Sequence, residues 1–267
     1  MEQSPEHYLA LAVEAARAGG DVVRAGALNR ANLSIERKRP NDFVSEIDRG
    51  SEVAILSHLR AHLPGHAVQA EESGTSGDSD YVWLIDPLDG TTNFLHGFPH
   101  YCISVAMQFK GKVVVGVVYD PIHQRLFTAT QGGGAWLNGQ RLSVTGPTSL
   151  AECLLGTGLP FSEWTYLDGY LSSLRTIMQR CGGVRRAGAA ALDLAFVAAG
   201  WLDGFWEKDL NPWDVGAGSL LVEEAGGVVS DFSGGGGFIE RRQIVAGARA
   251  VQAELVSVLH NHADMCA

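Results

Sequence analysis

The apolar residues near the start of the chain recur at helical spacing. Ser4 and Pro5 are typical N-cap and first-turn residues, and the apolar stripe behind them predicts an opening helix. A second stripe predicts another helix from about residue 45 to residue 63. That helix should stop at Pro64–Gly65, because proline and glycine both interrupt helices.

Between residues 81 and 137 the pattern changes to the short apolar runs that are typical of strands. The dipeptides Lys110–Gly111 and Asn138–Gly139 favour tight hairpins between such runs. Because a hairpin makes its two strands antiparallel, we expect a largely antiparallel sheet. The expected strands cover residues 81–85, 102–109, 113–119, 126–130 and 135–137.

After about Pro147 helical and strand patterns alternate. We expect helices at residues 167–179, 189–199, 213–225 and 249–260, and strands at 154–158, 202–207, 228–230 and 244–246. Gly226–Gly227 marks a helix end. Helices beside antiparallel strands indicate a layered α/β or α+β fold.

Length and charge narrow the class of protein. A chain of 267 residues forms one large domain or two tightly joined lobes. The net charge of −10 makes direct nucleic-acid binding through a basic surface a poor expectation. The acidic excess has two interpretations, a solubilising surface or carboxylates that cluster and require cations.

The sequence also predicts a cytoplasmic location. Residues 1–7 lack the basic and apolar regions of a secretion signal, and no apolar run reaches the ~18 residues of a membrane span. The four cysteines are Cys102, Cys153, Cys181 and Cys266. None are spaced as a Cys-x-x-Cys pair, so we expect reduced thiols rather than disulfides.

The segment of residues 83–94 carries the most chemistry. An apolar run leads into Asp86 and Asp89 around Pro87, and a type I turn there would bring the two carboxylates together. Oxygen ligands of this kind suit Mg2+ or Mn2+ better than Zn2+. Gly90 and Thr91 then offer backbone N–H groups, at a helix start that would favour phosphate. The plainer alternative is a polar turn with a capping aspartate.

Other acidic residues have weaker patterns. Glu71 stands beside a second glutamate before a glycine, as in many solvated loops. Asp42 is interpreted as a helix cap, and Asp48 falls in the first turns of the same helix. Asp214 follows a proline and a tryptophan at another helix start, where an aspartate is usually a cap.

Together these segments resemble the inositol monophosphatase family. The matching motifs are Glu-Glu-Ser at residues 71–73, Asp-Pro-Leu-Asp-Gly-Thr-Thr-Asn-Phe at 86–94, Pro-Trp-Asp at 212–214 and Glu-Glu-Ala-Gly-Gly at 223–227. The resemblance covers essentially the whole chain. It implies an αβαβα sandwich of the inositol monophosphatase and fructose-1,6-bisphosphatase type. Residues 1–148 would form a lobe with the main antiparallel sheet, and 149–267 a lobe with Asp214 and the substrate side.

The resemblance also implies a role for each site residue. Two or three Mg2+ ions, which Mn2+ could replace, would be held by Glu71, Asp86, Leu88 through its carbonyl, Asp89 and Asp214. Asp48 and Thr91, with Glu71 nearby, would orient the attacking water. The substrate would contact Asp89, Gly90 and Thr91 on its phosphate side, and Gly188, Ala190 and Glu207 on its alcohol side.

The implied activity is hydrolysis of inositol 1-phosphate by metal-activated water, in a lithium-sensitive, cytoplasmic homodimer. Alternative substrates are fructose 1,6-bisphosphate, histidinol phosphate or a 3′-phosphonucleotide. Thr92-Asn93-Phe94 resembles the inositol branch, because the nucleotide and histidinol branches usually place a lysine at the position of Thr92. A different alternative is a protein-binding regulator that retains the phosphatase fold.

Overall fold

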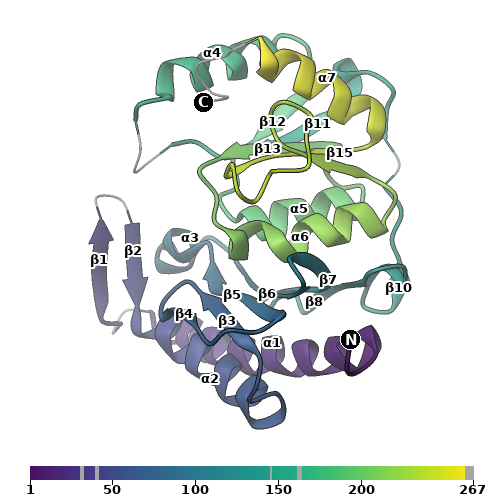
Figure 1. Cartoon of the computed structure of the whole chain (residues 1–267). Helices are drawn as coiled ribbons and strands as arrows, with labels where there is room; N and C mark the ends of the chain where they lie inside the picture. The colour runs from purple at the N-terminus through teal and green to yellow at the C-terminus, as the bar shows by residue number, and fades with distance from the viewer. Residues whose placement is uncertain (31–32, 40–41, 145, 161–163, 262–267) are drawn as a thin grey trace.

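The computed structural model describes residues 1–30, 33–39, 42–144, 146–160 and 164–261 (Figure 1). Cys266 lies outside the described residues. Within them, Cys102, Cys153 and Cys181 are free thiols, as the sequence predicts. No helix in the described ranges is long and apolar enough to cross a membrane.

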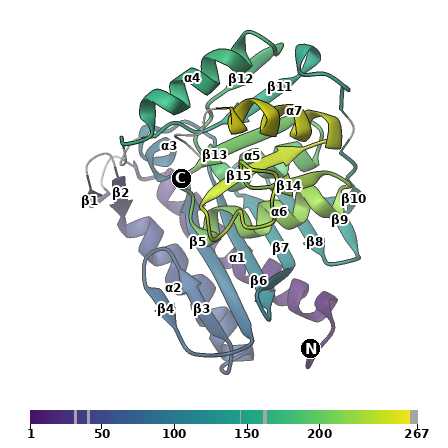
Figure 2. The same cartoon turned by 45° about the horizontal axis from the view of Figure 1, so that its top comes forward.

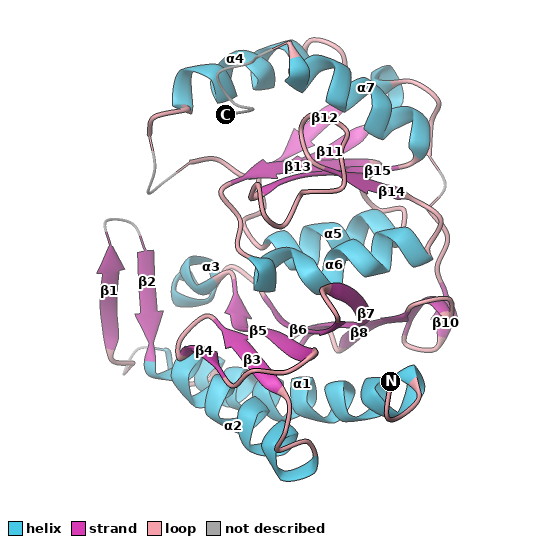
Figure 3. Ribbon diagram, viewed as in Figure 1, coloured by secondary structure: helices cyan, strands magenta, loops and turns pink. Residues whose placement is uncertain are grey.

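The elements stack in five layers (Figures 1 and 3). Helices α1 (Pro5–Ala27) and α2 (Glu46–His62) cover the outer face of an eight-stranded sheet. Helices α5 (Ala190–Ala198) and α6 (Pro212–Glu224) lie between this sheet and a five-stranded sheet. Helices α4 (Leu167–Met178) and α7 (Arg249–His260) cover the far side. The predicted αβαβα sandwich is confirmed.

The larger sheet has the order β10-β9-β8-β7-β6-β5-β3-β4 and is antiparallel except where β3 pairs with β5. Its strands are β3 (Ala67–Ala70), β4 (Gly74–Ser76), β5 (Tyr81–Asp89), β6 (Cys102–Phe109), β7 (Lys112–Asp120), β8 (Arg125–Thr130), β9 (Gly134–Leu137) and β10 (Gln140–Arg141). Both predicted hairpins form. Lys110–Gly111 joins β6 to β7 and Asn138–Gly139 joins β9 to β10, with positive φ at all four residues.

The smaller sheet has the order β12-β11-β13-β15-β14. Its strands are β11 (Leu154–Thr157), β12 (Gly183–Arg185), β13 (Gly204–Lys208), β14 (Val228–Ser230) and β15 (Gln243–Gly247). Strand β11 is parallel to both neighbours, whereas β15 is antiparallel to β13 and β14. A short 3-10 helix (Leu150–Glu152) precedes this sheet. The division into two lobes at residue 148 stays a prediction.

The start of α2 differs from the sequence-based expectation. Residues before it form an antiparallel ribbon of β1 (Ile35–Arg39) and β2 (Asp42–Ser45), which projects beside α3 (Thr91–His96) in both views (Figures 1 and 2). Asp42 therefore begins a strand, and its interpretation as a helix cap is wrong. Ser45 caps α2 instead, in a capping box with Asp48.

The helices of the middle layer lack an amphipathic pattern because they are covered on two opposite faces. Eight of the nine residues of α5 are buried, because the helix has a sheet on each side. Helix α6 contacts both sheets as well, and its Gly216 leaves room where an added Cβ would lie 2.8 Å from the Leu84 side chain. This layer carries residues of the second half of the chain against the ends of β5 and β6.

Candidate active site

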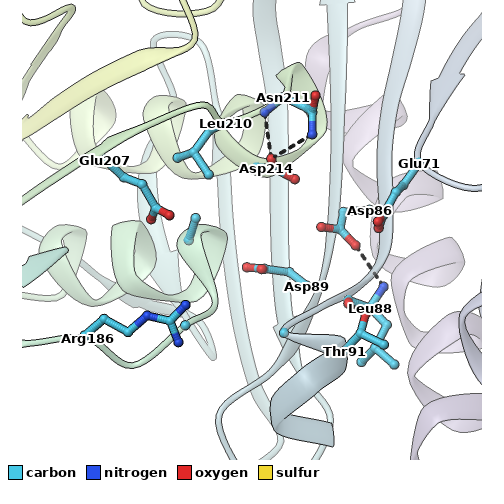
Figure 4. A pocket seen from close by; sticks show the side chains of 13 residues that line it. Glu71, Asp86, Leu88, Asp89, Thr91, Arg186, Glu207, Leu210, Asn211 and Asp214 are labelled. Carbon is cyan, nitrogen blue, oxygen red and sulfur yellow. Dashed lines mark hydrogen bonds between the residues drawn. The ribbon is translucent and has the colours of Figure 1, made fainter. Parts of the chain in front are cut away.

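A polar cavity of about 250 Å³ lies where β5, α3, α5, β13 and α6 meet (Figure 4). It is lined by Glu71, Asp86, Leu88, Asp89, Gly90, Thr91, Arg186, Gly188, Ala190, Glu207, Leu210, Asn211 and Asp214. All the residues expected to bind metal or substrate therefore lie around one cavity. Asp48 reaches it through a hydrogen bond to Thr91. Their roles remain predictions.

The carboxylates at the end of β5 are separated by a bulge rather than by the predicted type I turn. Asp86 pairs with Ser104 and Asp89 with Cys102, so one extra residue of β5 is accommodated between these pairs. The strand continues through Pro87, because a bulge tolerates a residue without an N–H group. Asp86 Oδ1 accepts the Leu88 amide at 3.0 Å within the bulge.

Thr91 links the start of α3 to α2. Its hydroxyl lies 2.8 Å from Asp48 Oδ1 and 3.1 Å from the Leu88 carbonyl oxygen. The other oxygen of Asp48 accepts the amide and hydroxyl of Ser45. Gly90 precedes α3 with φ +94°, and an added Cβ would lie 3.0 Å from the His100 carbonyl oxygen. The predicted helix start after Gly90 is confirmed.

Asp89 and Asp214 come from different halves of the chain and face the same cavity (Figure 4). Asp89 Oδ2 accepts the Ala191 amide at 2.8 Å, which fixes the start of α5 beside β5. Asp214 is the third residue of α6, and its Oδ2 accepts the Asn211 amide at 2.7 Å in a capping box. Asp214 is thus a helix cap and also a cavity residue.

The cavity concentrates negative charge in a poorly solvated space. Burial, followed by repulsion from Glu71, Asp89 and Asp214, raises the pKa of Asp86 well above its ordinary value. Burial likewise raises the pKa of Asp89 to about 7. The pKa of Asp214 is also about 7, through burial first and repulsion from Asp89 among the other causes. These carboxylates require protons or cations near neutral pH.

The oxygen donors fit Mg2+ or Mn2+. The described residues contain no group of three His, Cys, Asp or Glu side chains already placed around one ion. Mg2+ does not require such a cage, since it keeps several waters and often binds only one or two carboxylates together with substrate phosphate. The four carboxylates and the Leu88 carbonyl can be shared between ions in that way.

Glu207 and Arg186 lie on the side of the cavity away from Glu71 (Figure 4). Burial, then repulsion from Asp193, raises the pKa of Glu207 well above its ordinary value, while Arg186 opposes the rise. The sequence did not single out Arg186, Leu210 or Asn211 as cavity residues. Arg186 belongs to a conspicuous arginine pair, but only the fold distinguishes the one that faces the cavity.

The layered fold and the carboxylate-lined cavity define a phosphatase class. The chain belongs to the inositol monophosphatase family, whose model matches residues 4–264. Proteins of this family act on phosphate monoesters and are generally metal-dependent.

Similar proteins span nearly the whole chain. The "Nus factor SuhB" of Pseudomonas aeruginosa is 47% identical over 260 residues, covering 95% of this chain and 96% of the relative. The crystal structure of extragenic suppressor protein suhB from Bartonella henselae has a TM-score of 0.92 and 41% identity, covering 95% of this chain and 98% of that one. The IMPase of Thermotoga maritima has a TM-score of 0.87 and 33% identity, with 98% and 100% covered.

Proposed function

We propose that the chain hydrolyses inositol 1-phosphate to inositol and phosphate with Mg2+ as cofactor. The observation that carries this proposal is the convergence of Glu71, Asp86, Asp89 and Asp214 on one cavity beside Gly90 and Thr91. Such a cavity repels a phosphate dianion unless cations are bound. Family membership supports phosphate-ester chemistry, and the IMPase relative supports the choice of substrate.

Two or three Mg2+ ions would be held by Glu71, Asp86, Asp89, Asp214 and the Leu88 carbonyl. Bound Mg2+ would neutralise the phosphate and the carboxylates and would lower the pKa of water. Mn2+ has similar ligand preferences and could substitute. Lithium sensitivity remains part of this proposal.

The protein's own residues would position the reacting groups. Thr91 and Asp48, hydrogen-bonded at 2.8 Å, would hold the attacking water with Glu71 nearby. The backbone amides of Gly90 and Thr91 would bind phosphate oxygens, and Asp89 would lie at the boundary between phosphate and alcohol.

The alcohol side of the substrate would lie toward the second half of the chain. Gly188 and Ala190 are too small to fill the cavity, so they would contribute backbone contacts and clearance. Glu207 would accept hydrogen bonds from the substrate hydroxyls. Since hydrogen bonds to substrate hydroxyls discriminate between hydroxyl-bearing and plain substrates, Glu207 is the proposed specificity residue.

A panel of phosphate monoesters tests the proposal. The purified protein is assayed for released phosphate with Mg2+, with EDTA, and with Mg2+ restored after EDTA. The panel contains inositol 1-phosphate, fructose 1,6-bisphosphate, histidinol phosphate and a 3′-phosphonucleotide. We expect inositol 1-phosphate to have the highest kcat/KM and EDTA to abolish turnover. Full activity in metal-free buffer would contradict the proposal, and preference for another ester would reassign the substrate.

A protein-binding regulator is the second candidate function. It is favoured by the similarity to the Pseudomonas aeruginosa protein, which is named as a Nus factor. A pull-down from a lysate of the source organism, with wild type and Asp86→Asn as bait, separates the two functions. A partner retained equally by both would support a role independent of catalysis, and retention by neither would argue against it.

We also propose a cytoplasmic homodimer. Phe98 and Trp201 are 53% and 44% exposed, and His100 and Phe196 connect them in a continuous aromatic patch. Exposed patches of this kind mark interfaces. Light scattering should report a dimer for wild type and a monomer for Trp201→Ser. Met178→Ser, at another exposed apolar residue, should leave the dimer intact.

A further inference from the structure

Helix α2 presents polar side chains on a face that is fully buried. Asp48, Ser51 and Glu52 are at most 3% exposed and follow one another at helical spacing. Apolar Ile55 and Leu59 continue the same buried face toward the end of the helix. Burial of polar groups is costly unless each is hydrogen-bonded, so the partners of these three residues are informative.

Ser51 holds the bulge of β5. Its hydroxyl donates to the Pro87 carbonyl oxygen at 2.8 Å, between the two aspartates of the bulge. The regular ladder is interrupted there, so a side chain supplies the hydrogen bond. Gly19 of α1 leaves the necessary space, because an added Cβ at that position would lie 2.7 Å from Ser51 Oγ.

Glu52 holds the end of β3. Its Oε2 accepts the Glu72 amide at 2.8 Å, while the preceding amide, of Glu71, donates to the Ile85 carbonyl oxygen of β5 at 3.1 Å. Two consecutive amides are therefore fixed, one by α2 and one by β5. These bonds set the orientation of the peptide that carries the Glu71 side chain into the cavity.

We propose that Ser51 and Glu52 are positioning residues of the metal site. Together with Asp48, they let α2 hold three separate segments in place by hydrogen bonds. Glu52 bonds to the end of β3, Ser51 to the bulge of β5, and Asp48 to Thr91 at the start of α3. Glu52 would act through the Glu72 amide, because it is not among the residues that line the cavity. The inference rests on the proposed function and adds the residues that align its cation ligands.

Two substitutions of Glu52 test its role, one to glutamine, which has the same shape, and one to alanine, which lacks the accepting oxygen. A glutamine carbonyl oxygen can accept the Glu72 amide, whereas alanine cannot. Glu52→Ala should weaken binding of Mn2+ alone, measured by calorimetry, by about 10-fold or more, the scale of lost outer-shell support. The Mg2+ concentration for half-maximal activity should rise in parallel. Glu52→Gln should stay within about 3-fold of wild type, and exposed Glu46→Ala on the same helix should behave as wild type.

Ser51→Ala tests the proposal independently of Glu52. Its control is Ser57→Ala, at an exposed serine of α2. We expect weaker Mn2+ binding only for Ser51→Ala. Thermal unfolding in EDTA is recorded for every variant. A lower Tm with unchanged Mn2+ affinity would reduce Ser51 and Glu52 to structural residues and overturn the proposal. Equal losses for Glu52→Gln and Glu52→Ala would overturn it too, because they would make the charge essential.

Wild type is measured first to separate the two proposals. If it binds Mn2+ and hydrolyses phosphate esters, unaffected Glu52→Ala and Ser51→Ala variants contradict the positioning role alone. If wild type does neither, the proposed function fails and the positioning role fails with it.

Discussion

The cavity carboxylates should make the metal-free protein less stable at neutral pH than in mild acid. Burial raises the pKa of Asp214 from 3.8 to about 7. Between these values the folded state binds more protons than the unfolded state, so stability falls as pH rises from about 4 to 7. Asp214→Asn removes the ionisable group, and its carbonyl oxygen can still accept the Asn211 amide. This variant should therefore stabilise the metal-free protein at pH 8.

The magnitude follows from the same pKa. At 1.36 kcal/mol per pKa unit, the rise from 3.8 to about 7 corresponds to at most roughly 4 kcal/mol. Asp214 is only partly buried, so water reduces the cost of burying its charge and also screens the repulsion from Asp89. We therefore expect about 1–3 kcal/mol. For a chain of this length that free energy raises Tm by about 2–4 °C per kcal/mol.

Urea unfolding in EDTA at several pH values is the assay. The difference between Asp214→Asn and wild type should be largest at pH 8 and shrink toward pH 4. Asp168→Asn serves as the control, because Asp168 is an exposed acid in the first turn of α4. A destabilised Asp214→Asn at pH 8, or an equal effect of Asp168→Asn, would refute the argument.

Three further predictions concern catalysis. Asp86→Asn should lower kcat by at least about 10³-fold, the effect of losing a strong electrostatic stabiliser, in the phosphate-release assay; a comparable loss for Glu72→Gln would show that the wrong glutamate of the pair was chosen. Thr91→Ala should lower kcat with phosphate binding retained in calorimetry, and trapping a phospho-enzyme would exclude direct attack by water. Glu207→Ala should raise KM for inositol 1-phosphate by roughly 10-fold but leave p-nitrophenyl phosphate unchanged; equal losses would assign Glu207 a structural role.

The sequence predicts those parts of the fold that depend on local chemistry. Lys110–Gly111 and Asn138–Gly139 form hairpins because both residues of each turn adopt positive φ. The helix at residues 249–260 also has its predicted bounds. Apolar spacing identifies such elements because each buries one face against a neighbour.

The sequence pattern gives a wrong or missing prediction at two places, the bulge at Pro87 and the ribbon before α2. The predicted turn at Pro87 becomes a bulge because β6 continues to pair with β5, and Ser51 bonds to the Pro87 carbonyl from another helix. The β1–β2 ribbon was missed, and with it the strand role of Asp42. The partners of the bulge, Ser51 and β6, are distant from Pro87 in the sequence, so local propensity carries no signal for them. The ribbon is a local hairpin, in which Asp42 pairs with Arg39, but its strand Ile35–Arg39 is mostly charged and lacks the apolar alternation that predicts a strand.

One aspartate can cap a helix and belong to the candidate site at the same time, as Asp48 and Asp214 do. In Asp214, Oδ2 accepts the described hydrogen bonds, which the backbone amide and the side-chain amide of Asn211 donate. In Asp48, Oδ2 accepts two bonds from Ser45, while Oδ1 lies against Thr91. A carboxylate has two oxygens, so one can secure a helix end while the other serves the site. The capping bond then restricts the side-chain rotamer and fixes the direction of the second oxygen. Caps at Asp48 and Asp214 therefore favour a preorganised site, instead of arguing against one.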